Sequence, residues 1–131
     1  PVMTDSTSLS GTAPLLVDGE FILIVDDYPD ILTLLSEFLE EQELPTLQAA
    51  SAAEMRQTIA ERRIALILLD IGLPDANGID LLPELTSADP DLCVIMLTAV
   101  TDLQTALDCI RRGADDYMTK PIQFNDFLTT V

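Results

Sequence analysis

The sequence IALILLD at residues 64–70 decides the fold, because six consecutive apolar residues end abruptly in an acid. An uninterrupted apolar run of this length is typical of a strand that is buried on both faces of a parallel sheet. The loop that follows contains Pro74 and the pair Asn77-Gly78, which favour turns. We therefore predict a buried strand over residues 64–69, with Asp70 at its carboxyl end.

Apolar runs of the same kind recur on both sides of this strand. Further strands are predicted at residues 21–25, 44–49, 92–97 and 117–119. Between the strands, apolar residues recur at the three- and four-residue spacing of amphipathic helices. The predicted helical faces are Ile31, Leu34, Leu35, Phe38 and Leu39; Met55 and Ile59; Leu103, Ala106, Leu107 and Ile110; and Phe124, Phe127, Leu128 and Val131.

Short sequence signals mark the ends of these helices. Ser51 and Glu54 have the spacing of a capping box, and Pro29 suits the first turn of a helix. Gly113 stands where a left-handed residue after a helix is expected. A helix that contains Pro83 should be bent or shortened, because proline lacks the N–H donor. The strand–helix alternation predicts an α/β fold, in which a parallel sheet has helices on both faces.

Composition and charge exclude several classes of function. Of 131 residues, 6 are Lys or Arg and 23 are Asp or Glu, which gives a net charge of −17. Such a chain repels phosphate backbones and anionic lipids, so we predict that this segment binds neither nucleic acid nor membranes. No apolar run is long enough for a transmembrane helix. The absence of histidine excludes imidazole bases, His-ligated zinc and a phosphohistidine within the chain.

The domain organisation follows from the same composition. Residues 1–19 are rich in Ser, Thr, Pro and Gly and lack periodicity, so we expect a leader or linker there and one domain over residues 20–131. Cys93 and Cys109 stand in apolar stretches and are interpreted as small hydrophobic residues rather than a disulfide framework. No signal peptide is visible, and a cytoplasmic setting is expected.

Polar residues end four of the predicted strands. The first is followed by Asp26 and Asp27, the third by Asp70, the fourth by Thr98 and the fifth by Lys120, the only lysine in the sequence. Because the carboxyl ends of parallel strands lie at one edge of a sheet, these five side chains should converge there. Each alone is also explained as an ordinary loop residue, and Asp27 as a helix cap. The coincidence of all five favours a functional cluster.

Three carboxylates at one edge call for a compensating positive charge, since a pair about 4 Å apart repels by roughly 4 kcal/mol at an effective dielectric constant near 20. Oxygen donors without nitrogen or sulfur favour a hard cation, which is Mg²⁺ or its substitute Mn²⁺. Magnesium sites are often completed by phosphate oxygens, and a lysine ammonium and a threonine hydroxyl suit the remaining phosphoryl oxygens. The cluster therefore predicts a site for a phosphoryl group.

The nucleophile is best sought among the carboxylates. The sequence holds no P-loop, no G-x-G-x-x-G motif and no histidine to activate a serine or cysteine. Carboxylates form aspartyl phosphates in other enzymes, and the isolated Asp70 suits attack on phosphorus while the pair Asp26-Asp27 suits the metal. Two alternatives stay open: a phosphohydrolase with an aspartyl-phosphate intermediate, and an interaction module without phosphorylation. The stretch DDYPD at residues 26–30 does not fit the Asp-x-Asp-x-Thr pattern of haloacid-dehalogenase-like hydrolases.

Four motifs together resemble the receiver domain of response regulators in two-component signalling. They are IVDD at residues 24–27, DIGLPDANG at 70–78, LTA at 97–99 and GADDYMTKP at 113–121. Each motif is moderately specific, but all four occur in order, and the resemblance covers about residues 20–131. It implies a flavodoxin-like doubly wound sheet of five parallel strands in the order 2-1-3-4-5, flanked by five helices, of which the last is truncated at Val131.

The resemblance also implies the chemistry of the site. Asp70 would accept a phosphoryl group from the phosphohistidine of a histidine kinase or phosphotransfer protein in a phosphorelay. Asp26, Asp27 and Asp70 would hold Mg²⁺ together with the backbone carbonyl of Gly72. The chain would catalyse only its own phosphorylation and dephosphorylation, without turnover of small substrates.

A switch region is implied in the same way. Thr98 and Lys120 would contact the phosphoryl oxygens, and Tyr117 matches the family's switch aromatic, which turns inward when Thr98 shifts toward the phosphate. The Lys120-Pro121 bond would be cis, so Pro121 belongs to the same region. Phosphorylation would then change the packing of the fourth helix, fifth strand and fifth helix. That change would control an output domain on the same chain, a partner protein or a homodimer.

Overall fold

The computed structural model of the chain describes residues 19–98 and 103–119. Over these ranges strands and helices alternate as predicted. They are β1 (Glu20–Val25), α2 (Pro29–Glu41), β2 (Thr46–Ala49), α3 (Ala52–Glu61), β3 (Arg63–Asp70), α4 (Gly78–Ala88), β4 (Cys93–Thr98), α5 (Leu103–Arg111) and β5 (Asp116–Thr119). No helix among the described residues is long and apolar enough to cross a membrane. The predicted last helix, over residues 124–131, lies outside the described residues.

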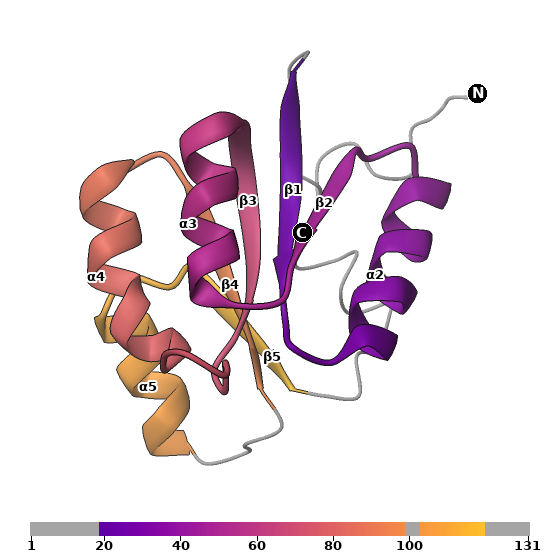
Figure 1. Cartoon of the computed structure of the whole chain (residues 1–131). Coiled ribbons are helices and arrows are strands. Elements are labelled where there is room, and N and C mark those ends of the chain that lie inside the picture. Colours follow the sequence, from indigo (N-terminus) through magenta and orange to yellow (C-terminus); the bar gives the residue numbers. More distant parts are fainter. Residues whose placement is uncertain (1–18, 99–102, 120–131) are drawn as a thin grey trace.

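The five strands form one sheet in the order β2-β1-β3-β4-β5, and every neighbouring pair is parallel (Figure 1). This confirms the predicted order 2-1-3-4-5. The central strand β3 pairs with β1 and β4, so that Leu69 lies beside Val25 and Asp70 beside Leu97. Because all strands are parallel, their carboxyl ends lie at one edge, here called the carboxyl edge, which is at the bottom of Figure 1. The opposite edge is the amino edge.

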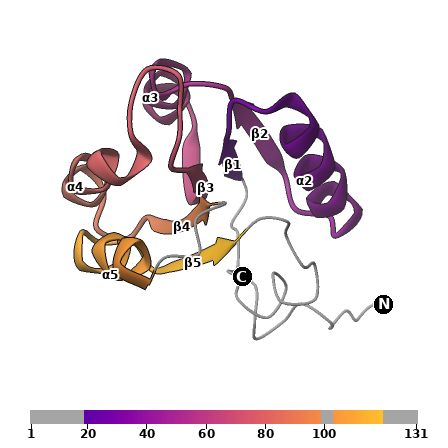
Figure 2. The same ribbon diagram turned by 90° about the horizontal axis from the view of Figure 1, so that it is seen from below.

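Helices cover both faces of the sheet, as the continuously apolar strands predicted (Figure 2). On one face Leu32, Leu35 and Leu39 of α2 pack against inward side chains of β1, β3 and β4. On the other face Met55 of α3 and Leu82 of α4 pack against the alternate side chains of the same strands. Fully burying one such side chain contributes roughly 1.5–3 kcal/mol to the free energy of folding. The two cores therefore fix the strands, and with them the residues at the strand ends.

Two helices bury somewhat different residues from those that the sequence predicted. In α2, Leu32 is buried while Leu34 is 50% exposed. In α5, Cys109 is buried while Leu107 and Ile110 are 39% and 44% exposed. Both helices carry more apolar residues than one face can hold. The spacing of apolar residues therefore identified the helices but did not decide which of these residues face the sheet.

The ends of the helices follow the sequence signals closely. Ser51 accepts a hydrogen bond from the backbone N–H of Glu54 at 3.1 Å, as a capping box requires. The Glu54 carboxylate accepts from the N–H of Ala50 at 2.8 Å, one residue before the N-cap position. Gly113 has a φ of 115°, which confirms its role in ending α5. Pro83 lies inside α4, which continues past it, so the proline does not end that helix.

Candidate functional site

Three acids meet at the carboxyl edge of the sheet. Asp26 and Asp27 follow β1 and Asp70 ends β3, and each offers a carboxylate oxygen that lies within 4.8 Å of the other two. Asp26 and Asp70 are buried, whereas Asp27 is exposed. The structure therefore brings together all three acids that the sequence assigned to one cluster.

Backbone hydrogen bonds position Asp26. Its N–H donates to the carbonyl oxygen of Ala49 at 3.1 Å, which extends the β1–β2 pairing by one residue. Its carboxylate oxygen Oδ1 accepts from the N–H of Tyr28 at 3.0 Å, which fixes the side chain over the following turn. The N-cap residue of α2 is Tyr28, so the alternative of Asp27 as the helix cap is wrong. Asp27 instead contributes to the acid cluster from its solvent side.

The backbone that follows Asp70 is tightly packed. The N–H of Ile71 donates to the carbonyl of Leu97 at 3.2 Å, and the N–H of Gly78 donates to the carbonyl of Ile71 at 2.6 Å. An added Cβ at Gly78 would collide with the carbonyl oxygen of Asp70 and lie 3.0 Å from the Cα of Ile71. The sequence placed Gly78 in a turn and at the end of the motif DIGLPDANG, without a packing role. The structure shows a second reason for glycine, because α4 begins directly against the backbone of the end of β3.

The remaining side chains of the predicted site are only partly described. Thr98 ends β4 at the carboxyl edge and is buried. Tyr117 stands on β5 with 37% of its surface exposed. Lys120 and Pro121 lie outside the described residues, so their roles and the cis Lys120-Pro121 bond stay predictions.

The loop between β3 and α4 is closed by its own hydrogen bonds. Gly72 forms an antiparallel bridge with Asn77, and the N–H of Leu73 donates to the carbonyl of Ala76 at 3.2 Å. The carbonyl of Gly72 as a metal ligand stays a prediction. Asp75 in this loop contacts α3, which is 22 and 23 residues earlier in the chain. Sequence reasoning included Asp75 only within a motif, because no local signal reveals a contact over that separation.

The Asp75 carboxylate accepts hydrogen bonds from the first two backbone N–H groups of α3. Oδ1 accepts from Ala52 at 2.8 Å and Oδ2 accepts from Ala53 at 3.0 Å. These bonds, that from Ala52 first, hold the pKa of Asp75 below its ordinary value. The partial positive charge at a helix N-terminus also favours an anion there.

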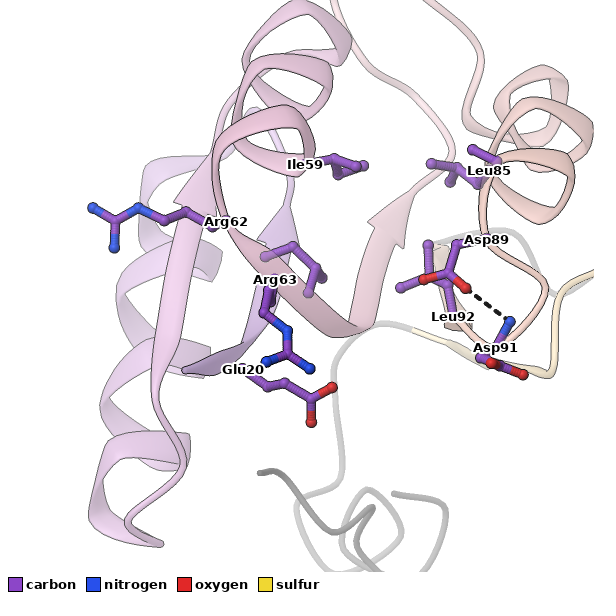
Figure 3. Close-up of a pocket in the computed structure, with 10 residues that line it drawn as sticks. Glu20, Ile59, Arg62, Arg63, Leu85, Asp89, Asp91 and Leu92 are labelled. Atoms are coloured by element: carbon purple, nitrogen blue, oxygen red, sulfur yellow. Dashed lines mark hydrogen bonds between the residues drawn. The ribbon is translucent and has the colours of Figure 1, made fainter. Parts of the chain in front are cut away.

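A pocket of about 350 Å³ lies at the amino edge, away from the three acids (Figure 3). Apolar side chains such as Ile59, Leu85 and Leu92 line it together with charged groups of both signs. Glu20 of β1 and Arg63 of β3 are register partners in the sheet and both line the pocket. Neither Thr98 nor any of the acids Asp26, Asp27 and Asp70 lines this pocket. It is therefore not the candidate site.

The two cysteines are free thiols. Cys109 is buried and Cys93 is partly buried. Burial raises the pKa of both thiols, that of Cys93 to about 11 with a smaller contribution from Asp115. Since the thiolate is the reactive form, a raised pKa disfavours reaction of either thiol at neutral pH, which agrees with their interpretation as small hydrophobic residues.

Comparison with known sequences points to one family. The family model described as the response regulator receiver domain matches residues 22–131. The chain is 40% identical over 100 residues to the response regulator protein PilR of Pseudomonas aeruginosa. These residues make up 76% of this chain and 22% of PilR. Such curated relatives are longer proteins, of which the chain spans about a fifth to a half.

Solved structures share the architecture. A response regulator protein from Burkholderia pseudomallei, with a phosphorylated aspartic acid, calcium ion and citrate, is 26% identical with a TM-score of 0.79, over 86% of this chain and 66% of that one. The beryllofluoride-activated NtrC4 receiver domain dimer is 32% identical with a TM-score of 0.79, over 83% of this chain and 90% of that one.

Proposed function

The chain belongs to the family of response regulator receiver domains, and from this premise we propose that Asp70 accepts the phosphoryl group that operates the switch. The donor is the phosphohistidine of a histidine kinase or a phosphotransfer protein. One observation carries the proposal: acids from segments far apart in the sequence place their carboxylate oxygens within 4.8 Å of one another. Like charges at this distance repel, so the cluster does not help the chain to fold and calls for another explanation.

Asp70 suits the nucleophile better than either acid of the pair. It is the last residue of the central strand. Its backbone lies beside Leu97 of β4 and packs against Gly78 at the start of α4. A nucleophile on such a rigid backbone keeps its orientation toward phosphorus and loses little freedom in the transition state. Asp26 and Asp27 are adjacent in sequence and can bind one cation together.

The donor atoms fit a hard divalent cation. Among the described residues the cluster offers carboxylate oxygens and no nitrogen or sulfur, a set that favours Mg²⁺ or Mn²⁺ over zinc or copper. Asp26, Asp27 and Asp70 would hold the ion, with the backbone carbonyl of Gly72 as a further ligand. When bound, the ion neutralises the negative charge of the acids and of the phosphoryl oxygens.

The transfer itself is an in-line displacement. A carboxylate oxygen of Asp70 forms a bond to phosphorus while the phosphorus–nitrogen bond of the donor breaks, and the electron pair of that bond returns to the imidazole nitrogen. The chain contributes position and charge. The hydroxyl of Thr98 and the ammonium group of Lys120 would bind the remaining phosphoryl oxygens and stabilise the acyl phosphate.

The output is a shift between two packings of α5, β5 and the segment that follows. A hydrogen bond from Thr98 to a phosphoryl oxygen exists only in the phosphorylated state, so it favours one packing over the other. Tyr117, which is 37% exposed here, would turn inward in that state. The change would act on an output domain of the same polypeptide, on a partner or on a homodimer, and the free thiols agree with a cytoplasmic setting.

Incubation with acetyl phosphate and Mg²⁺ tests the proposal. We expect intact mass spectrometry to detect one added phosphoryl group, which depends on Mg²⁺ and disappears in Asp70→Asn. The matched control is Asp91→Asn, which makes the same change in an acid at the amino edge and should be phosphorylated like the wild type. Wild-type protein that takes up no phosphoryl group would point to an interaction module instead, and turnover of assorted phosphate esters would point to a hydrolase.

A further inference from the structure

We propose that Asp75 is a positioning residue for the metal site, because it ties the loop of residues 72–77, here called the Gly72 loop, to the start of α3, directly after the strand β2 that pairs with Asp26. The inference rests on the proposed function, which assigns Mg²⁺ to Asp26, Asp27, Asp70 and Gly72. Asp75 itself is exposed and takes no part in the acid cluster. Its effect on the cation would be transmitted through the backbone.

Asp75 uses both of its carboxylate oxygens in its contact with the start of α3. Each carboxylate oxygen of Asp75 accepts one N–H, from Ala52 at 2.8 Å and from Ala53 at 3.0 Å. The N–H of the next residue, Glu54, donates to Ser51, the N-cap of α3. The first turn of a helix leaves such N–H groups without partners inside the helix. Asp75 thus supplies from another loop the acceptors that α3 does not supply for its first two residues.

One end of this contact leads to Gly72. The loop from Gly72 to Asn77 is closed by the bridge between these two residues and by the hydrogen bond from Leu73 to Ala76. The side chain of Leu73 is also buried in the core. Because the loop is closed in this way, a restraint on Asp75 also restrains the backbone at Gly72.

The other end leads to Asp26. The carbonyl of Ala49 accepts the N–H of Asp26, and Ala49 stands three residues before Ala52 at the end of β2. The short connection between them is further held by the carboxylate of Glu54, which accepts from the N–H of Ala50. Asp75 therefore joins the loop of Gly72 to the connection after β2, and the last residue of β2, Ala49, accepts the N–H of Asp26.

A separate contact links α3 to α4, the helix that follows the loop. Arg56 of α3 donates to both carboxylate oxygens of Glu84 in α4, at 2.8 and 3.0 Å. With this bidentate pair intact, removal of Asp75 removes the contact between the loop and α3 while Arg56 and Glu84 still link α3 to α4. A change in metal affinity would then report the position of the loop rather than a general opening of the fold.

Calorimetric titration with Mg²⁺ of the unphosphorylated chain tests the inference. In Asp75→Ala we expect the Kd for Mg²⁺ to rise about tenfold, the lower end of the effect seen when groups that orient metal ligands are removed. In Asp75→Asn one oxygen still accepts a hydrogen bond, so the Kd should rise less. Ser51→Ala is the matched control, because it removes another acceptor from the same helix end and leaves the loop attached.

Amide hydrogen exchange gives a second measurement. In Asp75→Ala the N–H groups of Ala52 and Ala53 and those of the Gly72 loop should exchange faster, while in Ser51→Ala only the helix end should do so. If Ser51→Ala weakens Mg²⁺ binding as much as Asp75→Ala, or if neither Asp75 variant changes it, Asp75 is only a helix cap and the inference is wrong. Should Asp75→Ala not fold, Asp75→Asn decides alone. Wild-type protein that is not phosphorylated and binds no Mg²⁺ would instead overturn the proposed function.

Discussion

The two edges of the sheet carry their charges in different ways. At the carboxyl edge, three carboxylates of one sign lie within 4.8 Å of one another. At the amino edge, the residues around the pocket are of both signs; the charged ones are Glu20, Arg62, Arg63, Asp89 and Asp91. Mixed charges compensate one another, whereas a cluster of one sign is costly unless a positive charge, such as the predicted Lys120 ammonium or a bound cation, lies beside it. This difference supports the proposal that the cation binds at the carboxyl edge rather than at the amino edge.

The direction of the helices supports the same difference. Each helix follows one strand and leads to the next parallel strand, so helix N-termini lie at the carboxyl edge and C-termini at the amino edge. Negative charge is favoured near an N-terminus and positive charge near a C-terminus, by roughly 0.3–1 kcal/mol each. Asp75 at the start of α3 and Arg62 at its C-cap agree with this rule, whereas Glu61 in the last turn of α3 and Asp89 at the C-cap of α4 do not. The fold thus favours acids at the carboxyl edge.

The largest effect is expected from a substitution that disturbs the packing of the carboxyl edge. In Gly78→Ala the new methyl group meets backbone atoms of Asp70 and Ile71, which cannot move aside cheaply. We expect the free energy of unfolding to fall by about 3 kcal/mol, as in other overpacked sites, and phosphorylation of Asp70 to be lost or slowed. Urea denaturation and acetyl phosphate labelling measure the two effects.

Gly72→Ala is the matched control in the same loop. Nothing lies within 4 Å of an added Cβ at Gly72, so its stability should change by less than about 0.5 kcal/mol. Equal effects of the two substitutions would mean that the backbone around Asp70 is not held by α4, and that the carboxyl edge is no more rigid than an ordinary loop.

The next effect concerns the cation. At a Mg²⁺ concentration about 100-fold above its Kd, the free energy of unfolding of the wild type should rise by about 2.7 kcal/mol through linkage. Asp70→Asn should lose most of this gain, whereas Asp91→Asn at the amino edge should keep it. An equal response of both variants would show that Mg²⁺ acts on the overall negative charge of −17 rather than on one site.

Much of this architecture was predictable from sequence, because strand burial and strand ends are local properties. The run IALILLD at residues 64–70 showed both the strand and the position of its acid, and parallel topology then brought Asp26, Asp27 and Asp70 together. The exposure of Leu34 was not predictable, since an apolar helix can turn one residue or another toward the sheet without changing its pattern.

Long-range contacts of the loops were not predictable either. Asp75 reaches amides that are 22 and 23 residues away, and the geometry depends on the conformation of two loops at once. Gly78 was recognisable as a turn residue, but its contact with the backbone of Asp70 follows only from how α4 meets β3. Sequence patterns thus identify residues at strand ends better than the residues that hold them in place.

A smaller effect is expected when the repulsion within the cluster is relieved. In the absence of divalent cations, Asp27→Asn should raise the free energy of unfolding by about 1 kcal/mol, a value reduced by the exposure of Asp27 to solvent. Asp91→Asn should change it by less than about 0.5 kcal/mol. The gain should shrink in about 1 M salt, where charges are screened within about 3 Å. Destabilisation by Asp27→Asn under these conditions would contradict a repulsive cluster.

The smallest effect is a pH dependence at the start of α3. The amides of Ala52 and Ala53 hold the pKa of Asp75 below its ordinary value of 3.8. Its stabilising contribution is therefore complete above pH 3.8 and is lost as the pH falls through the lowered pKa, because the protonated carboxyl is a weaker acceptor. The difference in unfolding free energy between wild type and Asp75→Asn should accordingly be constant near neutral pH and shrink in acid. The difference in unfolding free energy between wild type and Ser51→Ala involves no titrating group and should stay constant. If this difference also shrinks in acid, the acid effect belongs to the whole helix end rather than to Asp75.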